Sequence, residues 1–204
     1  GLVTLQVFDG FSRLAESPAS CLLVAGLALL VLVMTPDPTV RFISTLQIVV
    51  ALSCCYAHQD VHLWRLMAVV VATALVVLIL KEPILLTRMM RAALGPIGLG
   101  LTVSLYGLCM VPIGVALRDV ENVDVWPVTL CLTLLSMGVL IRICGELGMK
   151  WSQPRVLGLA FGCGLLGLCC YETPGVMAAV LTLIIAFRGR KLSLLVGSVA
   201  FLIF

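Results

Sequence analysis

The stretch from Leu63 to Leu80 reads LWRLMAVVVATALVVLIL and decides the fold. After Arg65 it contains no charged side chain, and wound as an α-helix it is apolar around its whole circumference. Such a helix lies either in a large protein core or in a membrane. A strand of a transmembrane barrel would alternate polar and apolar residues with a period of two, and this stretch does not. The pattern therefore predicts a helix that is surrounded by apolar material.

Seven further runs of the same kind follow one another along the chain, separated by short polar segments. Prolines lie at or near the ends of most runs, where a missing backbone donor costs little. At about 20 apolar residues per span, a chain of 204 residues holds at most about eight spanning helices. We therefore expect an all-α, polytopic transmembrane helix bundle of about eight spans. The seven runs are 18–35, 40–57, 92–117, 126–143, 156–171, 175–187 and 192–204.

The composition excludes several classes of protein. Hydrophobic residues make up 62% of the chain and charged residues 11%, and the mean hydropathy is +1.21. Soluble domains are about 45 to 50% apolar and about 25% charged. With 13 Lys and Arg against 10 Asp and Glu, the chain also lacks a basic stripe for nucleic acid. A soluble enzyme, a disordered chain and a nucleic-acid-binding protein are therefore excluded.

The two ends of the chain differ from the runs between them. Residues 1–17 include Asp9, Arg13 and Glu16 and lack the basic start and small-residue cleavage site of a secretory signal. We interpret 1–17 as an N-terminal interfacial segment or a cut edge, and 18–204 as the transmembrane helical domain. The last run stops at Phe204 without a polar flank, which favours a fragment whose last span is truncated.

Basic residues divide unequally between the two faces that alternating spans would create. One set of loops holds ten of the 13 Lys and Arg residues, and the other set, with the N-terminal segment, holds Arg13, Arg65 and Arg118. Because cytoplasmic loops carry an excess of Lys and Arg, we place the ten inside and the N-terminus outside the cytoplasm. The ten are Arg41, Lys81, Arg88, Arg91, Arg142, Lys150, Arg155, Arg188, Arg190 and Lys191.

The longest connection in this scheme runs from 81 to 94 and mixes basic residues with Leu and Met. We expect either an amphipathic helix on the inner leaflet, attracted by anionic lipid, or a cytoplasmic cap that joins two spans.

A metal-like pattern is formed by His58 and His62, which are four residues apart with Asp60 between them. A helical turn would place both imidazoles on one face, but we expect this segment to be a loop, and it lacks the glutamate of an HExxH motif. We interpret the pair as polar loop residues and expect neither a metal nor a cofactor. The nine cysteines form no CxxC pair, and we interpret them as packing residues.

Catalytic patterns are missing from the runs. None of the Asp, Glu, Lys, Arg and His residues falls in the middle third of a run, although ion and proton pathways need such groups in mid-membrane. The sequence contains no GxSxG, HExxH or P-loop motif. We therefore predict that the chain is not an enzyme and has no catalytic residue.

Glycines give a clearer signal, which concerns helix packing. Gly100, Gly107 and Gly114 recur every seven residues, and Gly158 and Gly162 have a GxxxG spacing. Small residues let two membrane helices approach closely, and close packing is what holds such helices together in lipid. We predict that these five glycines are helix-packing positions, within the chain or against a partner.

One part of the sequence resembles a known family. Residues 174–180 read PGVMAAV, and residues 187–197 read FRGRKLSLLVG. They resemble a bacterial family of multi-pass inner-membrane proteins classified as a domain of unknown function, most closely over residues 170–204. Members are often encoded beside, or fused to, a second hydrophobic domain and a small partner with a GDYxxLxY signature. The resemblance implies a bacterial inner-membrane location and a partner class, but no activity.

Three functions agree with these patterns. The first is a multi-pass membrane protein without catalytic chemistry, which acts as a structural or assembly component. The second is a transporter or channel for a small neutral solute, with the fourth and sixth runs lining a path. The third is a membrane-anchoring segment of a viral polyprotein. The expected partners are the lipid bilayer and another membrane protein or a second copy, as a homo-oligomer.

Overall fold

The computed structural model describes residues 18–57, 63–80, 88–116, 124–150, 152–189 and 192–203, and within them the chain is all-helical, without a strand. Eight helices make up this described part. The N-terminal segment expected at 1–17 lies outside it. The helices are α2 (Pro18–Met34), α3 (Pro38–Ala57), α4 (Leu63–Leu80), α5 (Arg88–Ala116), α6 (Trp126–Glu146), α7 (Pro154–Cys169), α8 (Pro174–Gly189) and α9 (Leu192–Ile203).

The turn between α2 and α3 shows how short polar segments separate the helices. Asp37 precedes α3, and its Oδ1 atom accepts hydrogen bonds from the backbone N–H groups of Thr39 at 2.7 Å and Val40 at 3.3 Å. An aspartate at this position satisfies backbone donors that have no partner within the helix. Arg41 closes the turn from the other side, because its Nε atom donates to the Thr35 carbonyl at 2.8 Å.

The end of α6 depends on a glycine. Gly148 has a φ of 76°, a left-handed conformation that glycine adopts without a steric penalty. The Leu147 and Met149 N–H groups donate to the last carbonyls of α6, each at 3.0 Å, as in other helices that end on a left-handed residue. Pro154 then begins α7 in its first turn, where no backbone donor is needed.

The connection expected at 81–94 is wrong over its second half. Helix α5 begins at Arg88, so residues 88–94 are the first turns of α5 and do not form a separate surface helix. Arg, Met, Ala and Leu favour helix formation, and no helix-ending residue interrupts them. The helix also continues through Pro96 and Pro112. Residues 81–87 lie outside the described residues.

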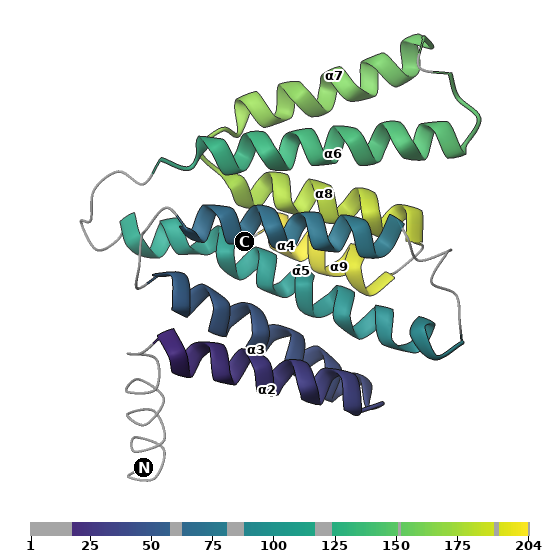
Figure 1. Ribbon diagram of the computed structural model, residues 1–204. Helices are drawn as coiled ribbons and strands as arrows, with labels where there is room; N and C mark the ends of the chain where they lie inside the picture. The colour runs from purple at the N-terminus through teal and green to yellow at the C-terminus, as the bar shows by residue number, and fades with distance from the viewer. Residues whose placement is uncertain are drawn as a thin grey trace.

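The helices form a row in which successive helices run in opposite directions (Figure 1). Helix α2 lies at one edge of the row and α7 at the other. Helix α4 packs against α3, α5, α6 and α8, whereas α9 packs mainly against α8. The C-terminal ends of α2, α4, α6 and α8 lie on the same side of the molecule, at the right-hand ends of the helix axes in Figure 1. We call this side the α6 C-terminal end.

The core lies between α4, α5, α6 and α8. Its centre consists of side chains that are fully buried, including Leu75, Leu105, Leu132 and Leu181. Small residues allow the helices to approach there, since Ala68, Ala72 and Ala178 are also 0% exposed. Close packing of this kind gives many weak dispersion contacts.

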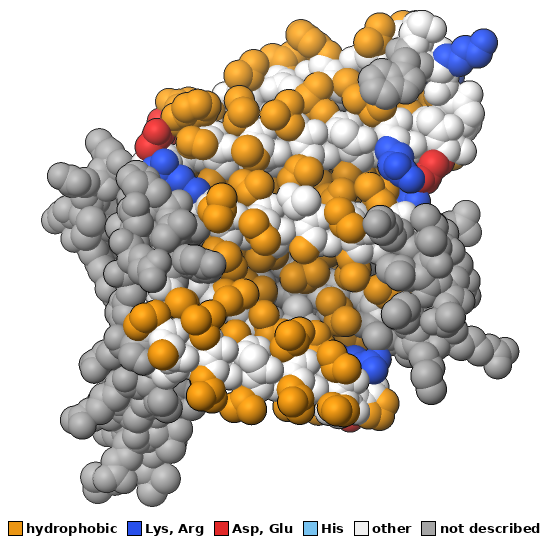
Figure 2. All heavy atoms as spheres, viewed as in Figure 1, with side chains coloured by type: hydrophobic (Ala, Val, Ile, Leu, Met, Phe, Trp, Pro, Cys, Tyr) orange, Lys and Arg blue, Asp and Glu red, His pale blue; other side chains and the backbone are white. Residues whose placement is uncertain are grey.

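The surface carries many large hydrophobic side chains. Large hydrophobic side chains are exposed along the helices, and a broad apolar belt separates the charged ends (Figure 2). Buried polar side chains are all Ser or Thr in the described part of the chain. Every described charged side chain lies in a turn or within four residues of a helix terminus. These are Asp37, Arg41, Arg65, Asp124, Arg142, Glu146, Lys150, Arg155, Glu172 and Arg188.

Two of the described helical stretches, Pro38–Cys55 and Trp126–Glu146, are long and apolar enough to cross a membrane. Basic residues that the sequence pattern assigns to one set of loops also lie at the same ends of the helices. Of the described ones, Arg41, Arg142, Lys150, Arg155 and Arg188 belong to the α6 C-terminal end, and Arg65 belongs to the opposite end.

Candidate functional site: a groove between α6 and α7

The two histidines considered as metal ligands, His58 and His62, lie outside the described residues. Among the residues that the structure does describe, no group of three or more His, Cys, Asp and Glu side chains is placed to hold a metal ion.

The five predicted packing glycines have different surroundings. A Cβ atom at Gly100 would lie 2.8 Å from the Thr45 Cβ atom and 3.2 Å from the Phe42 carbonyl oxygen, so α5 and α3 touch there and only glycine fits. At Gly107, Gly158 and Gly162 an added Cβ would meet nothing within 4 Å. Those three faces are open within the described part of the chain, and packing against a partner stays a prediction for them. For Gly114 the structure describes the helical backbone but not the side-chain surroundings.

Two close glycine contacts are not among the five predicted positions. A Cβ atom at Gly167 would lie 2.6 Å from the Thr133 Cγ2 atom, where α7 meets α6. One at Gly175 would lie 3.1 Å from the Phe201 ring, where α8 meets α9. Gly167 lies nine residues after Gly158, outside the GxxxG spacing, and Gly175 is the second residue of α8, so neither belongs to the glycine spacings used for the prediction.

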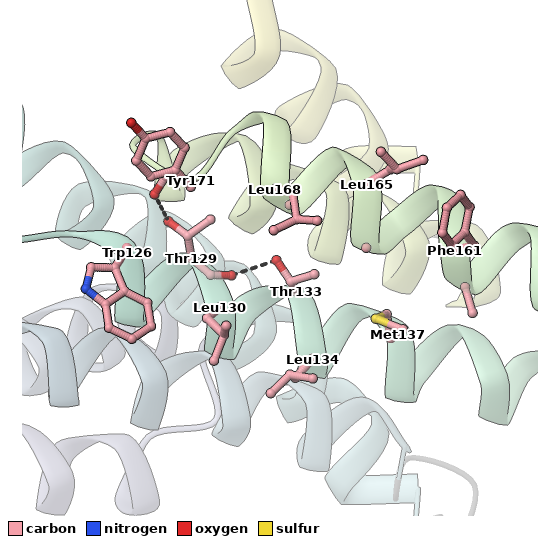
Figure 3. A pocket seen from close by; sticks show the side chains of 13 residues that line it. Trp126, Thr129, Leu130, Thr133, Leu134, Met137, Phe161, Leu165, Leu168 and Tyr171 are labelled. Atoms are coloured by element: carbon pink, nitrogen blue, oxygen red, sulfur yellow. Dashed lines mark hydrogen bonds between the residues drawn. The ribbon is translucent and has the colours of Figure 1, made fainter.

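A groove of about 680 Å³ lies between α6 and α7. Trp126 and Tyr171 lie at one end of it, and Phe161 and Met137 lie at the other (Figure 3). Its walls are almost entirely hydrocarbon, and its size falls within the usual range for ligand pockets. The groove is lined by Trp126, Thr129, Leu130, Thr133, Leu134, Met137, Ala160, Phe161, Gly164, Leu165, Gly167, Leu168 and Tyr171.

The two threonine hydroxyl groups in the groove are already bonded within the protein. Thr129 Oγ1 donates to the Tyr171 carbonyl at 2.9 Å, and Thr133 Oγ1 donates to the Thr129 carbonyl at 2.7 Å (Figure 3). Each hydroxyl has only one proton to give. At the mouth, the neighbouring Glu172 carboxylate raises the pKa of the exposed Tyr171 phenol. The groove therefore suits a hydrocarbon surface better than a polar solute.

A second polar feature, the hydroxyl junction, joins α5, α8 and α9. It consists of Tyr106, Thr182 and Ser198, whose oxygen atoms are mutually hydrogen-bonded. Ser198 also donates to the Leu194 carbonyl at 2.7 Å, and Thr182 bonds to carbonyls of its own helix. The Phe201 ring stacks on Tyr106 with centroids 4.1 Å apart.

Each proton of the hydroxyl junction therefore has an acceptor, and two of its three residues, Thr182 and Ser198, are almost completely buried. A satisfied network of this kind holds helices together. It offers no free donor for a reaction or for a solute.

The fold and the groove define a class of protein: an array of apolar helices with charged ends, and a groove between α6 and α7 whose walls are almost entirely hydrocarbon. The comparison with protein families matches the chain over residues 1–204 to the family described as a domain of unknown function, DUF4401, and the chain belongs to that family. The match extends beyond the segment at 170–204 on which the sequence resemblance rested. No curated protein and no solved structure matches the chain.

Proposed function

We propose that the chain is a multi-pass integral membrane protein whose described helices cross the bilayer as a bundle. The distribution of side chains supports this proposal. In water, exposed apolar patches larger than a few hundred Å² are rare and mark an interaction surface. Here the exposed apolar belt crosses several helices, while Ser44, Ser136 and Ser198 are buried. In lipid this arrangement is favourable, because hydrocarbon contacts hydrocarbon and polar groups bond inside the bundle.

We propose further that this membrane is the bacterial inner membrane, with the α6 C-terminal end in the cytoplasm. The accumulation of basic residues at that end supports the orientation. Reporter fusions would test it. Fusions after Arg91, Arg155 and Lys191 should report the cytoplasm, and a fusion after Arg118 should report the opposite side. A cytoplasmic signal after Arg118 would overturn the orientation.

Within the membrane, we propose that the chain is a structural or assembly component without catalytic chemistry. The single observation that supports this most is the groove between α6 and α7. The groove is apolar, and both of its threonine hydroxyls already donate to carbonyl groups of the protein. Among the described helices, α6 is the only main packing neighbour of α7. Such a groove fits an apolar helix of another membrane protein, where close contact supplies the stabilisation.

Site-directed photocrosslinking in native membranes would test this role. A photoreactive residue at Leu134, which lines the groove, should give a discrete protein adduct. Gly164→Leu should abolish the adduct, because Gly164 lines the same groove and an added Cβ there lies 3.8 Å from Met137. Gly26→Leu is the matched control, since a Cβ at Gly26 of α2 would meet nothing within 4 Å. An adduct that survives Gly164→Leu would contradict the proposal.

The transporter hypothesis receives no specific support from the geometry. It requires the fourth and sixth runs, now α5 and α7, to line one path. In Figure 1 α6 and α8 lie between them, and the two helices are not among each other's main neighbours.

A further inference from the structure

An ion-pair cluster joins three helices at the α6 C-terminal end. Arg188 near the end of α8 donates from Nε to Glu146 Oε2 at 2.8 Å and from Nη2 to Glu146 Oε1 at 2.9 Å. Its Nη1 atom donates to the carbonyl of Ile79 in α4 at 3.1 Å. The Arg188 side chain is 17% exposed, so its position is fixed by these three bonds.

The cluster keeps positive charge and free donors. A guanidinium has five N–H groups, and the three bonds of Arg188 leave two for another acceptor. Arg142 lies 3.6 Å from Glu146 Oε1, with its side chain 58% exposed, and in the described part of the chain it donates no short hydrogen bond. Two arginines therefore share one carboxylate, which leaves a net charge of about +1 on the cluster. In the sequence, Arg190 and Lys191 follow Arg188 closely.

A cavity of about 520 Å³ opens beside this cluster, between α6, α8 and α9. Its walls combine the charged pair with apolar side chains from all three helices. The cavity thus combines the Arg188–Glu146 ion pair with a hydrocarbon interior. Arg142 does not line the cavity but lies beside it, 3.6 Å from Glu146 Oε1. It is lined by Ile143, Glu146, Leu147, Ala186, Phe187, Arg188, Leu192 and Leu195.

We propose that this cavity binds one anionic phospholipid, with its phosphate on Arg142 and the free N–H groups of Arg188 and an acyl chain along Ile143, Leu147 and Leu195. Charge complementarity supports this occupant, because guanidinium groups form strong charge-assisted bonds with phosphate. The apolar walls explain why the phosphate should carry an acyl chain. The inference rests on the proposed membrane location.

Native mass spectrometry of the purified full chain in mild detergent would test the inference, with phosphatidylglycerol and phosphatidylcholine of the same chain length as probes. The wild type should retain phosphatidylglycerol in preference. Arg142→Gln should lower that retention about fivefold, the effect of about 1 kcal/mol per basic residue at an anionic surface, and leave phosphatidylcholine unchanged. Arg155→Gln is the matched control, because Arg155 is an exposed residue at the same end that belongs neither to the ion-pair cluster nor to the cavity lining.

Glu146→Gln distinguishes binding from a structural role. The substitution breaks the Arg188–Glu146 ion pair, which would weaken a purely structural cluster. It also removes the only negative charge of the cluster and frees two N–H groups of Arg188 for phosphate. Phosphatidylglycerol retention should therefore rise, whereas a purely structural cluster would lose lipid when Glu146 is changed. Equal retention of both lipids by the wild type would overturn this inference alone. Retention of neither lipid would overturn it and also count against the membrane location.

Discussion

Helices α7 and α8 are neighbours in sequence and equal in length, at 16 residues each, yet they occupy opposite kinds of position. Helix α8 is central, and Met177, Ala178 and Leu181 are 0% exposed. Helix α7 lies at the edge of the row, where Phe161 is 69% and Leu168 is 73% exposed. Both helices are apolar all round. The difference shows that apolarity brings a helix into the array, but neither apolarity nor a supply of small residues determines how deeply it packs, because α7 contains four glycines.

The largest expected difference between the two helices concerns their leucines. Leu181→Ala in α8 should lower the free energy of unfolding by about 2 to 3 kcal/mol, near the low end for a buried leucine. In lipid the hydrophobic contribution to helix association is missing, so the loss comes from the cavity that the smaller side chain leaves. Leu168→Ala in α7 should change it little. Unfolding in mixed micelles would measure both, and equal losses would contradict the central position of α8.

Glycines of α7 should respond with opposite signs. Gly167→Ala should lower the free energy of unfolding by about 1 to 2 kcal/mol, because its Cβ would overlap Thr133 and separate α7 from α6. Gly162→Ala, where space is open, should raise it by about 0.5 to 1 kcal/mol, because alanine favours the helix more than glycine. The same unfolding measurement checks both variants. A loss at Gly162 in the isolated chain would indicate a packing contact that this arrangement lacks.

The helix boundaries could be predicted from the sequence because prolines and charged residues lie where apolar runs stop. The predicted run 156–171 became α7 at Pro154–Cys169, and the run 175–187 became α8 at Pro174–Gly189. The exception was α5, because Arg88 and Arg91 in its first turns led us to predict a connection between two helices there. Its backbone has no reason to stop between Arg88 and Pro96, so helix propensity prevailed over hydropathy.

Neighbour relations could not be predicted in the same way. The glycine spacing found Gly100 against Thr45, but it also selected Gly158 and Gly162, whose faces are open. A glycine creates room for contact without specifying whether a helix uses it. The contact of Arg188 with Glu146 joins residues 42 apart, and hydropathy contains no information on such pairs. The groove likewise follows from the edge position of α7, which the sequence pattern does not distinguish from the position of α8.

Charged termini offer a smaller test of the same comparison. Arg188→Gln at the end of α8 should lower the free energy of unfolding by about 1 kcal/mol, since it removes a two-bond contact with Glu146 that is partly exposed and therefore screened. Arg155→Gln at the start of α7 should have no measurable effect, because that side chain is exposed. High salt should reduce the difference between the two variants. A difference that is independent of salt would indicate a packing effect of Arg188.

The smallest expected effect is the coupling between hydroxyl groups that tie α8 to its neighbours. Tyr106→Phe and Thr182→Val each remove one oxygen from the hydroxyl junction, and their double-mutant cycle should give a coupling of about 0.6 kcal/mol, the average for hydrogen bonds between membrane helices. Tyr106→Phe combined with Thr73→Val is the control, because Thr73 is exposed and donates only to Val69 of its own helix at 2.8 Å. That pair should show no coupling. Absence of coupling in both cycles would mean that the hydroxyls act within single helices, and that the hydroxyl junction does not hold α8 in its central position.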